Sequence, residues 1–304
     1  MKVAQTGSFF FVNLVLFLNM FQLKKMNYTT IFSFVFMMLL SMNVYTQDTQ
    51  PVNPFLDFEM SVQKMFYRMI QTEDDDIKEV INDTIRNHFI DFLDKKGSFE
   101  HEFDSLKSIG AVMSDDNELK IYTWNLPYFD GTHGFYGFIQ IRPDDKEPTI
   151  TVELQHNNER IPNFENAIIT ASNWYGALYY DIINTKHKGE TYYTLLAYDP
   201  HDIFTKRKII DVLNIREGNM LSFGRAIFQK QNRSLHRVVF EYSARVGMML
   251  RFNDSMEMII YDHLSPSSPA YEGRYQYYGP DFSYDGFEFD DGLWIHQEDI
   301  RIEY

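Results

Sequence analysis

The chain has 304 residues, 44% of them hydrophobic and 16% aromatic, which allows one large domain or two small ones and excludes the disordered class, whose members have few aromatic side chains. Its net charge of −15 makes nucleic acid and anionic lipid surfaces poor partners. Cysteine is absent, which excludes disulfides, thiolate metal sites, cysteine nucleophiles and an acyl anchor on a lipidated cysteine.

Residues 1–46 are predicted to form a signal peptide. They contain two apolar runs, 9–21 and 31–40, and each is too short to span a bilayer. Lys24 and Lys25 supply the positive charge that precedes the apolar part of such a segment. Cleavage would remove three lysines and no acid, so the net charge would fall from −15 to −18.

Two alternatives concern this segment. Thr46 is not the ideal small residue at a cleavage site, so an uncleaved membrane anchor is the alternative to cleavage before Gln47. Met26, or Met20, is a candidate for the true start of translation. We expect residues 47–54 to form a linker, and the rest of the chain to be exported to the periplasm, the cell surface or the medium, with no membrane contact beyond the signal segment.

Two amphipathic helices are predicted within a helical segment that spans residues 55–110, because apolar residues recur at spacings of three and four. The second helix is expected to start at Asp74–Asp76, whose carboxylates can cap free amides, and to stop at Gly97 after a cationic last turn. The expected buried stripes are Phe58, Val62, Met65, Phe66 and Met69 in the first helix, and Ile77, Val80, Ile81, Ile85, Phe89 and Phe92 in the second.

Residues 111–304 are predicted to form one antiparallel β domain. Short β-branched and aromatic runs alternate with turn clusters, and connections as short as 185–190 join antiparallel neighbours. The predicted fold class is α+β, mainly β, with an antiparallel meander, barrel-like or sandwich sheet and N-terminal amphipathic helices. Strands are expected at 119–124, 135–141, 149–154, 174–183, 191–198, 208–213, 238–243, 248–252 and 256–262, with a closing pair within 287–295.

The most concentrated polar feature is the acidic aromatic segment 278–286, which is predicted to be a loop containing two turns. Calcium takes six to eight oxygen ligands, so a calcium site is one interpretation, although the spacing is not that of an EF-hand. The turn interpretation is favoured, and no cofactor is predicted. The candidate calcium ligands are Asp281, Asp285, Asp290 and Asp291.

No specific enzyme signature is present, which favours a non-catalytic protein. Asp262 and His263 end a predicted strand just before Ser265, and His263 could act as the base of a hydrolase, with Asp262 as its orienting carboxylate and an unidentified serine as nucleophile. That interpretation is disfavoured, because adjacent residues of a strand point to opposite faces.

Adjacent aromatic residues such as Trp174 and Tyr175 should place one member of each pair outside the core. Exposed rings can bind a ligand, but cross-strand aromatic pairs also stabilise sheets without one. The structural role is the favoured interpretation of these pairs.

Five strings in the C-terminal two thirds of the chain are fairly specific: WYGALYY (174–180), YTLLAYD (193–199), KIIDVL (208–213), VFEYSA (239–244) and YGPDFSYDG (278–286). On these strings the chain resembles an uncharacterised secreted family of Bacteroidota. The resemblance implies export and a shared fold, and it implies no activity, cofactor or catalytic residue. The N-terminal helices fall largely outside it.

The leading hypothesis is an exported, non-catalytic binding or envelope-structural module with a carbohydrate or peptide ligand. One alternative is a secreted hydrolase that uses carboxylates such as Asp281 and Asp285 as general acid and base, which requires one of them to lie in a cleft with a raised pKa. A structural subunit of an envelope complex is the other. The predicted binding residues are Trp174, Tyr175, Tyr278, Asp281, Tyr284 and Asp285.

Overall fold

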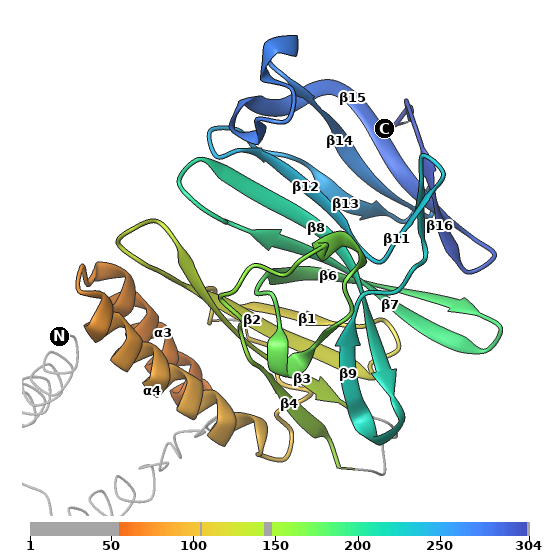
Figure 1. The fold of residues 1–304 in the computed structure, drawn as a ribbon. Helices are drawn as coiled ribbons and strands as arrows, with labels where there is room; N and C mark the ends of the chain where they lie inside the picture. Colours follow the sequence, from red (N-terminus) through yellow and green to blue (C-terminus); the bar gives the residue numbers. More distant parts are fainter. Residues whose placement is uncertain (1–54, 104, 143–147, 303–304) are drawn as a thin grey trace, which may run out of the picture. The chain divides into compact units, whose positions relative to one another are not determined.

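Two helices precede three β-sheets in the computed structural model of the chain, which describes residues 55–103, 105–142 and 148–302 (Figure 1). The predicted class, mainly β with N-terminal helices, is confirmed. Residues 1–54, with the expected signal peptide and linker, lie outside the described residues. Within the described residues, no helix has the length and apolar character needed to cross a membrane.

The helices are α3 (Leu56–Gln71) and α4 (Asp75–Leu93). The predicted cap is confirmed, because the Asp74 side chain accepts a hydrogen bond from the backbone N–H of Ile77 at 3.1 Å. The predicted end of α4 is wrong. The helix stops at Leu93, before the lysine pair, and Gly97 follows in a left-handed conformation (φ +89°).

The predicted stripe of α4 is partly wrong, because Ile77 and Val80 are exposed. The helix instead turns Lys78 and Asn82 toward the first sheet. The Lys78 ammonium donates to the carbonyl of Pro127 at 3.0 Å, and the Asn82 side chain accepts from the Trp124 indole at 2.8 Å. These polar contacts set the rotation of the helix, while Ile81, Ile85, Phe89 and Phe92 form its buried face.

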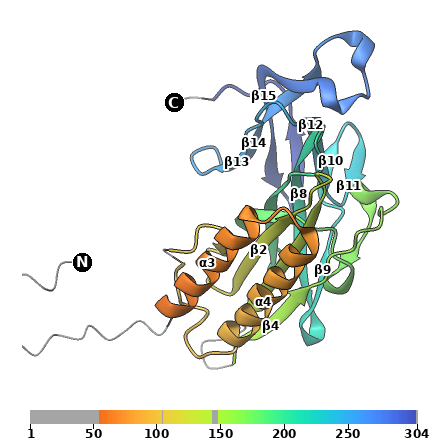
Figure 2. The same cartoon turned by 90° about the vertical axis from the view of Figure 1, so that its left-hand side faces the viewer.

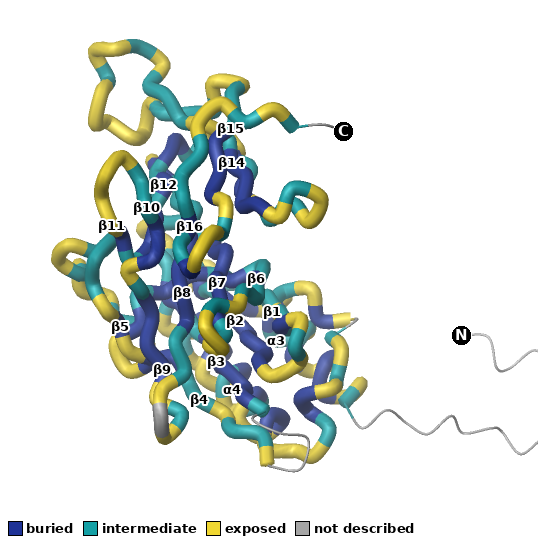
Figure 3. Tube along the Cα trace, turned by 90° about the vertical axis from the view of Figure 1, so that its right-hand side faces the viewer, coloured by how far each residue is buried: buried dark blue, intermediate teal, exposed yellow. Residues whose placement is uncertain are grey.

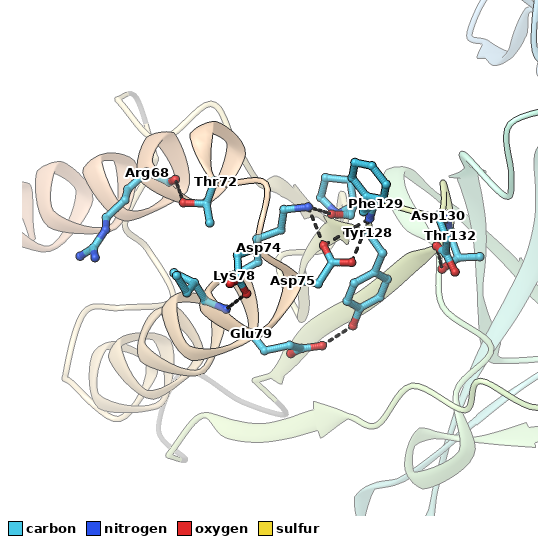
Figure 4. Close-up of polar contacts among 12 residues, drawn as sticks. Arg68, Thr72, Asp74, Asp75, Lys78, Glu79, Tyr128, Phe129, Asp130 and Thr132 are labelled. Carbon is cyan, nitrogen blue, oxygen red and sulfur yellow. Dashed lines mark hydrogen bonds and ion pairs between the residues drawn. The ribbon is translucent and has the colours of Figure 1, made fainter.

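Carboxylates of the first turn of α4 bind the hairpin at 127–132 (Figure 4). Asp75 accepts from the Lys78 ammonium at 2.7 Å and from the Phe129 amide at 3.0 Å, and these bonds lower its pKa. Glu79 accepts from the hydroxyls of Tyr128 and Tyr136. The helix is therefore tied to the sheet at this end by side chains as well as by apolar packing.

The first sheet has the order β1-β2-β3-β4 and is antiparallel throughout. The helices cover one of its faces (Figure 2), where Tyr122, Trp124 and Phe138 pack against them. Its other face contributes Leu119 and Ile121 to a second hydrophobic cluster. Its strands are β1 (Gly110–Met113), β2 (Leu119–Pro127), β3 (His133–Ile141) and β4 (Ile150–Leu154).

The second sheet has the order β5-β9-β8-β7-β6, and a further strand, β12, pairs with β8. One of its faces packs on the first sheet and the other packs on the third, so this sheet contributes to two hydrophobic clusters. Its strands are β5 (Ile169–Thr170), β6 (Leu178–His187), β7 (Glu190–Asp199), β8 (Thr205–Arg216), β9 (Met220–Phe223) and β12 (Val238–Ser243).

The third sheet has the order β11-β10-β16-β15-β14-β13, and its pairs are antiparallel except for β10 with β16. Buried residues concentrate along the strands, and exposed residues at the connections (Figure 3). Its strands are β10 (Phe228–Lys230), β11 (Arg233–Leu235), β13 (Leu250–Asn253), β14 (Met258–Pro266), β15 (Tyr278–Asp290) and β16 (Leu293–Gln297).

Several expectations along the β region need correction. The strand predicted from residue 174 starts at Leu178, and the segment 278–286 is the first part of β15 instead of a loop. The short strands β1, β5, β9, β10 and β11 were not predicted. Short 3₁₀ helices occur at η2 (Phe164–Asn166), η3 (Ala171–Asn173), η4 (Glu217–Asn219), η5 (Pro269–Tyr271) and η6 (Tyr275–Tyr277).

Candidate functional site

Asp281 and Asp285 lie on β15 at a bulge in its pairing with β14. The register runs regularly to the pair Asp262 and Tyr284 and resumes at Leu264 and Pro280. One residue of β14, His263, therefore faces three residues of β15. Bulges of this kind redirect side chains and are frequent beside functional sites.

Phe282, in the middle of this bulge, has its side chain in solvent. The residue is 94% exposed and has a φ of +72°, in the left-handed region that a bulky side chain rarely adopts. The Asp281 carboxylate holds the turn by accepting from the Ser283 hydroxyl at 2.7 Å and from the Ser283 amide at 3.2 Å. The backbone thus presents an apolar ring to water at a conformational cost, which is a feature of ligand-binding sites.

His263 is oriented by a buried carboxylate. Its Nδ1 lies 2.8 Å from Oδ2 of Asp285, whose side chain is only 5% exposed, while the imidazole itself is 46% exposed. Because the carboxylate accepts, Nδ1 donates, and Nε2 is left facing outward. Nε2 lies 4.0 Å from Oδ2 of Asp281.

Asp281 is held in its ionised form. Partial burial opposes ionisation, but hydrogen bonds from the Ser283 side chain and backbone, with further contributions from His263 and Ser265, lower the pKa of this carboxyl group. Near neutral pH the group is therefore a hydrogen-bond acceptor. It lacks the raised pKa that a general acid needs.

Behind the surface, Asp285 is surrounded by groups that can carry positive charge. Its Oδ2 lies 3.7 Å from Nε2 of His296, a buried atom that makes no hydrogen bond within the described part of the chain. Burial and the nearby Lys230 charge lower the pKa of His296, and burial also lowers the pKa of Lys230. The backbone N–H of Asp299 donates to the other oxygen of Asp285 at 3.2 Å. This layer fixes Asp285, which in turn fixes His263.

Two of the predicted binding residues, Trp174 and Tyr175, do not lie at this bulge. Trp174 has no exposed surface and donates through its indole to the Tyr179 hydroxyl at 2.9 Å, in the cluster between the first two sheets. It lies before β6, where it bridges to His156 and its ring inserts between the layers. Tyr175 packs against the same cluster and contacts Tyr179 through its hydroxyl. Trp174 therefore cannot present a face to a ligand.

Two other predicted residues flank the bulge. The Tyr278 hydroxyl accepts from the Gly273 amide at 2.9 Å, and its ring packs on the core of the third sheet. Tyr284 is half-buried and pairs in register with Asp262. Both residues support the strand that carries Asp281.

The four carboxylates suggested for calcium do not come together. Asp290 and Asp291 lie at the turn into β16, about 16 Å along the strand from Asp285. In residues 55–103, 105–142 and 148–302, no group of three or more His, Cys, Asp or Glu side chains is arranged to hold a metal ion.

The sequence analysis did not identify the carboxylate that orients His263. Asp262 does accept elsewhere, from the Met249 amide at 2.6 Å, as expected for adjacent residues of a strand. Asp285 takes its place from the neighbouring strand, 22 residues further along the chain. The register of β14 against β15 would have placed Asp285 beside His263, but residues 278–286 were predicted to be a loop, so no such register was considered.

Two cavities lie away from the bulge. One of about 380 Å³ lies between α3 and α4, lined by Met65, Ile77 and Val80 among others. The other, of about 400 Å³, lies beside Lys208. Neither is lined by His263, Asp281 or Asp285.

Comparison of the chain with protein-family models and with curated proteins gives no match.

Proposed function

We propose that the chain is an exported, non-catalytic binding protein and that it binds carbohydrate at the bulge of β14 and β15. We call this the bulge surface and define it by His263, Asp281 and Phe282. The observation that carries the proposal is Phe282, which is held almost fully in solvent by a strained backbone beside a fixed carboxylate and a fixed imidazole.

The chemistry of the bulge surface suits a sugar. The face of an exposed phenyl ring can stack on the apolar C–H face of a pyranose. The ionised Asp281 accepts hydrogen bonds from hydroxyl groups, and Nε2 of His263 offers a second polar contact close by. Because Ser283 and Asp285 already hold these groups, little conformational entropy is lost when a ligand binds.

Further aromatic rings lie on the connection that precedes β15, between Pro266 and Tyr278. Tyr271 and Tyr277 stack with their ring centroids 4.1 Å apart, and Tyr275 and Tyr277 are exposed. These rings could extend the contact along an oligosaccharide, which favours a chain of several sugars over a monosaccharide.

A hydrolase is the second candidate, because the His263–Asp285 pair has the geometry of a general base and its orienting carboxylate. The hydrolase predicted from the sequence would use Asp281 or Asp285 as its general acid. The lowered pKa of Asp281 disfavours that role for Asp281. If it holds, bound oligosaccharides will be cleaved, and His263→Ala will abolish the cleavage while it weakens binding only by the loss of one polar contact.

The test is binding of the labelled chain to an array of neutral cello-, xylo- and malto-oligosaccharides. We expect Phe282→Ala to weaken binding roughly tenfold, the value of a lost stacking contact. Phe129→Ala is the matched control, since Phe129 is another exposed phenylalanine at a turn, and it should bind as the wild type does.

Two results on the array would overturn the proposal: no binding by the wild-type chain, or equal binding by Phe282→Ala. Capture of basic peptides on a parallel array, with no oligosaccharide bound, would indicate the peptide alternative. No ligand on either array would favour the structural subunit.

A further inference from the structure

The cavity beside Lys208 lies where β1 and β2 meet β6. Its volume of about 400 Å³ is in the range of small-molecule sites. Side chains from several strands line it, with Thr123 and Asn125 on β2, Tyr180 on β6, Tyr198 on β7 and Lys208 on β8. The site is therefore supported by rigid elements of two sheets.

The Lys208 ammonium lies against aromatic faces, 4.1 Å from the ring centroid of Tyr180 and 5.3 Å from that of Tyr198. Burial lowers its pKa to about 8, and no neighbouring carboxylate opposes this shift. Within the described parts of the chain it has neither a hydrogen bond nor an ion pair. Two π faces lie against its positive charge.

Among the described residues, Lys78 and Lys120 are buried and have polar partners, whereas Lys230, like Lys208, is partly buried and lies over two aromatic rings. Lys120 donates to the carbonyls of Phe99 and His101 at 3.0 and 2.6 Å, and Lys78 pairs with Asp75. Even partial burial of an ammonium without such partners has a desolvation cost. In a chain with 43 acidic and 28 basic residues, an ammonium kept apart from carboxylates is suited to an anion from outside.

The rest of the cavity suits a ligand with one charged end. Thr123 already accepts from the Tyr179 amide at 3.1 Å, so its hydroxyl proton is left to donate. The walls also include the apolar side chain of Leu178, and Lys107 adds a second positive charge in an exposed position. Lys208 is partly buried and Lys107 is exposed, so the ammonium inside the cavity matches a single negative charge better than the double charge of a phosphate monoester.

We propose that this cavity binds a small organic carboxylate, with its carboxylate group against the Lys208 ammonium and its apolar body against Leu178 and the ring of Tyr180. We call it the Lys208 pocket. The proposal is independent of carbohydrate binding at the bulge surface, because the two sites share no residue.

Calorimetric titration of the full chain with benzoate at pH 7 tests this proposal, with benzamide as the neutral probe of the same shape. We expect benzoate to bind and benzamide to bind at least roughly tenfold more weakly, since a charge-assisted contact is lost. Lys208→Met should weaken benzoate binding to a similar degree. Lys206→Met, on the same strand but outside the cavity lining, should leave it unchanged.

The proposal is overturned if the wild-type chain does not bind benzoate, if benzamide binds as well, or if Lys208→Met binds benzoate normally. Should Lys208→Met fail to fold, the wild type supplies the test through the NMR titration of its Lys208 side chain. Saturating benzoate should raise the midpoint of that titration, because a bound anion favours the ammonium form. A midpoint that does not move would refute the contact.

Discussion

Arg237 and Asp211 form an ion pair in which neither side chain is exposed to solvent, with Nε and Oδ2 2.9 Å apart. The guanidinium also donates to the carbonyl of Phe164 and lies over the Phe164 ring. Burial raises the pKa of Asp211, and the positive charge of Arg237 opposes that shift. The pair joins β8 to the segment before β12, so the fold depends on both charges being present together.

Arg237→Met should lower the free energy of unfolding by about 3–5 kcal/mol, because it leaves a buried carboxylate without its partner. Urea denaturation at pH 7 measures this change. Arg233→Met is the matched control, since Arg233 is exposed and 3.7 Å from Glu165, and such surface pairs contribute about 0–1 kcal/mol. Equal stability of the two variants would contradict the importance of the buried pair.

At the scale of elements, His156 connects the end of β4 to the strand-like segment at Trp174. Its Nδ1 accepts from the Phe135 amide of β3 at 3.2 Å, and its ring packs edge-on against the Phe135 ring. Burial lowers its pKa to about 4, and a hydrogen bond from the ring to the Tyr175 backbone partly opposes the shift. The contact between these segments therefore requires a neutral imidazole.

The stability of the fold should depend on pH through His156. Between about pH 6.5 and 4 the unfolded chain binds a proton at this histidine that the folded chain does not, so the free energy of unfolding falls as the pH falls through this window. The contribution is about 3 kcal/mol once the pH is below 4. Urea denaturation of the wild type and His156→Gln at pH 7 and 4.5 measures it. An equally steep loss of stability in the variant would refute this assignment.

Elements with regular periodicity could be predicted from the sequence, and irregular ones could not. The cap at Asp74 and the strand at 119–124 followed from local chemistry and alternation. Pro280 and Gly286 are turn-forming residues, so β15 was predicted as a loop, although its pairing with β14 accommodates them at and beside a bulge. This error affected the predicted site most, because the contact between His263 and Asp285 depends on the long-range register of two strands.

The rotation of α4 and the position of Trp174 could not be predicted for a related reason. Val80 fits an apolar stripe as well as Ile81 does, and only the contacts of Lys78 and Asn82 with the sheet decide between two faces of the helix. Trp174 fits the alternation of the next strand, but it inserts between two layers whose spacing the local sequence does not encode.

On the scale of the whole molecule, the proposal of export rests on the apolar N-terminal residues. N-terminal sequencing of the native protein should give a chain that starts near Gln47, because the apolar run 31–40 is followed there by a polar stretch. Fractionation should place that chain outside the cytoplasm. An intact N-terminus on cytosolic protein would contradict export.

Carbohydrate binding at the bulge surface is the central claim, and NMR shift mapping tests it most directly. The labelled chain would be titrated with the oligosaccharide that gives the strongest signal on the array. The account predicts that shift changes concentrate at His263, Ser265 and residues 281–283, with the Lys208 pocket unaffected. Changes that concentrate elsewhere and leave Phe282 unmoved would contradict it.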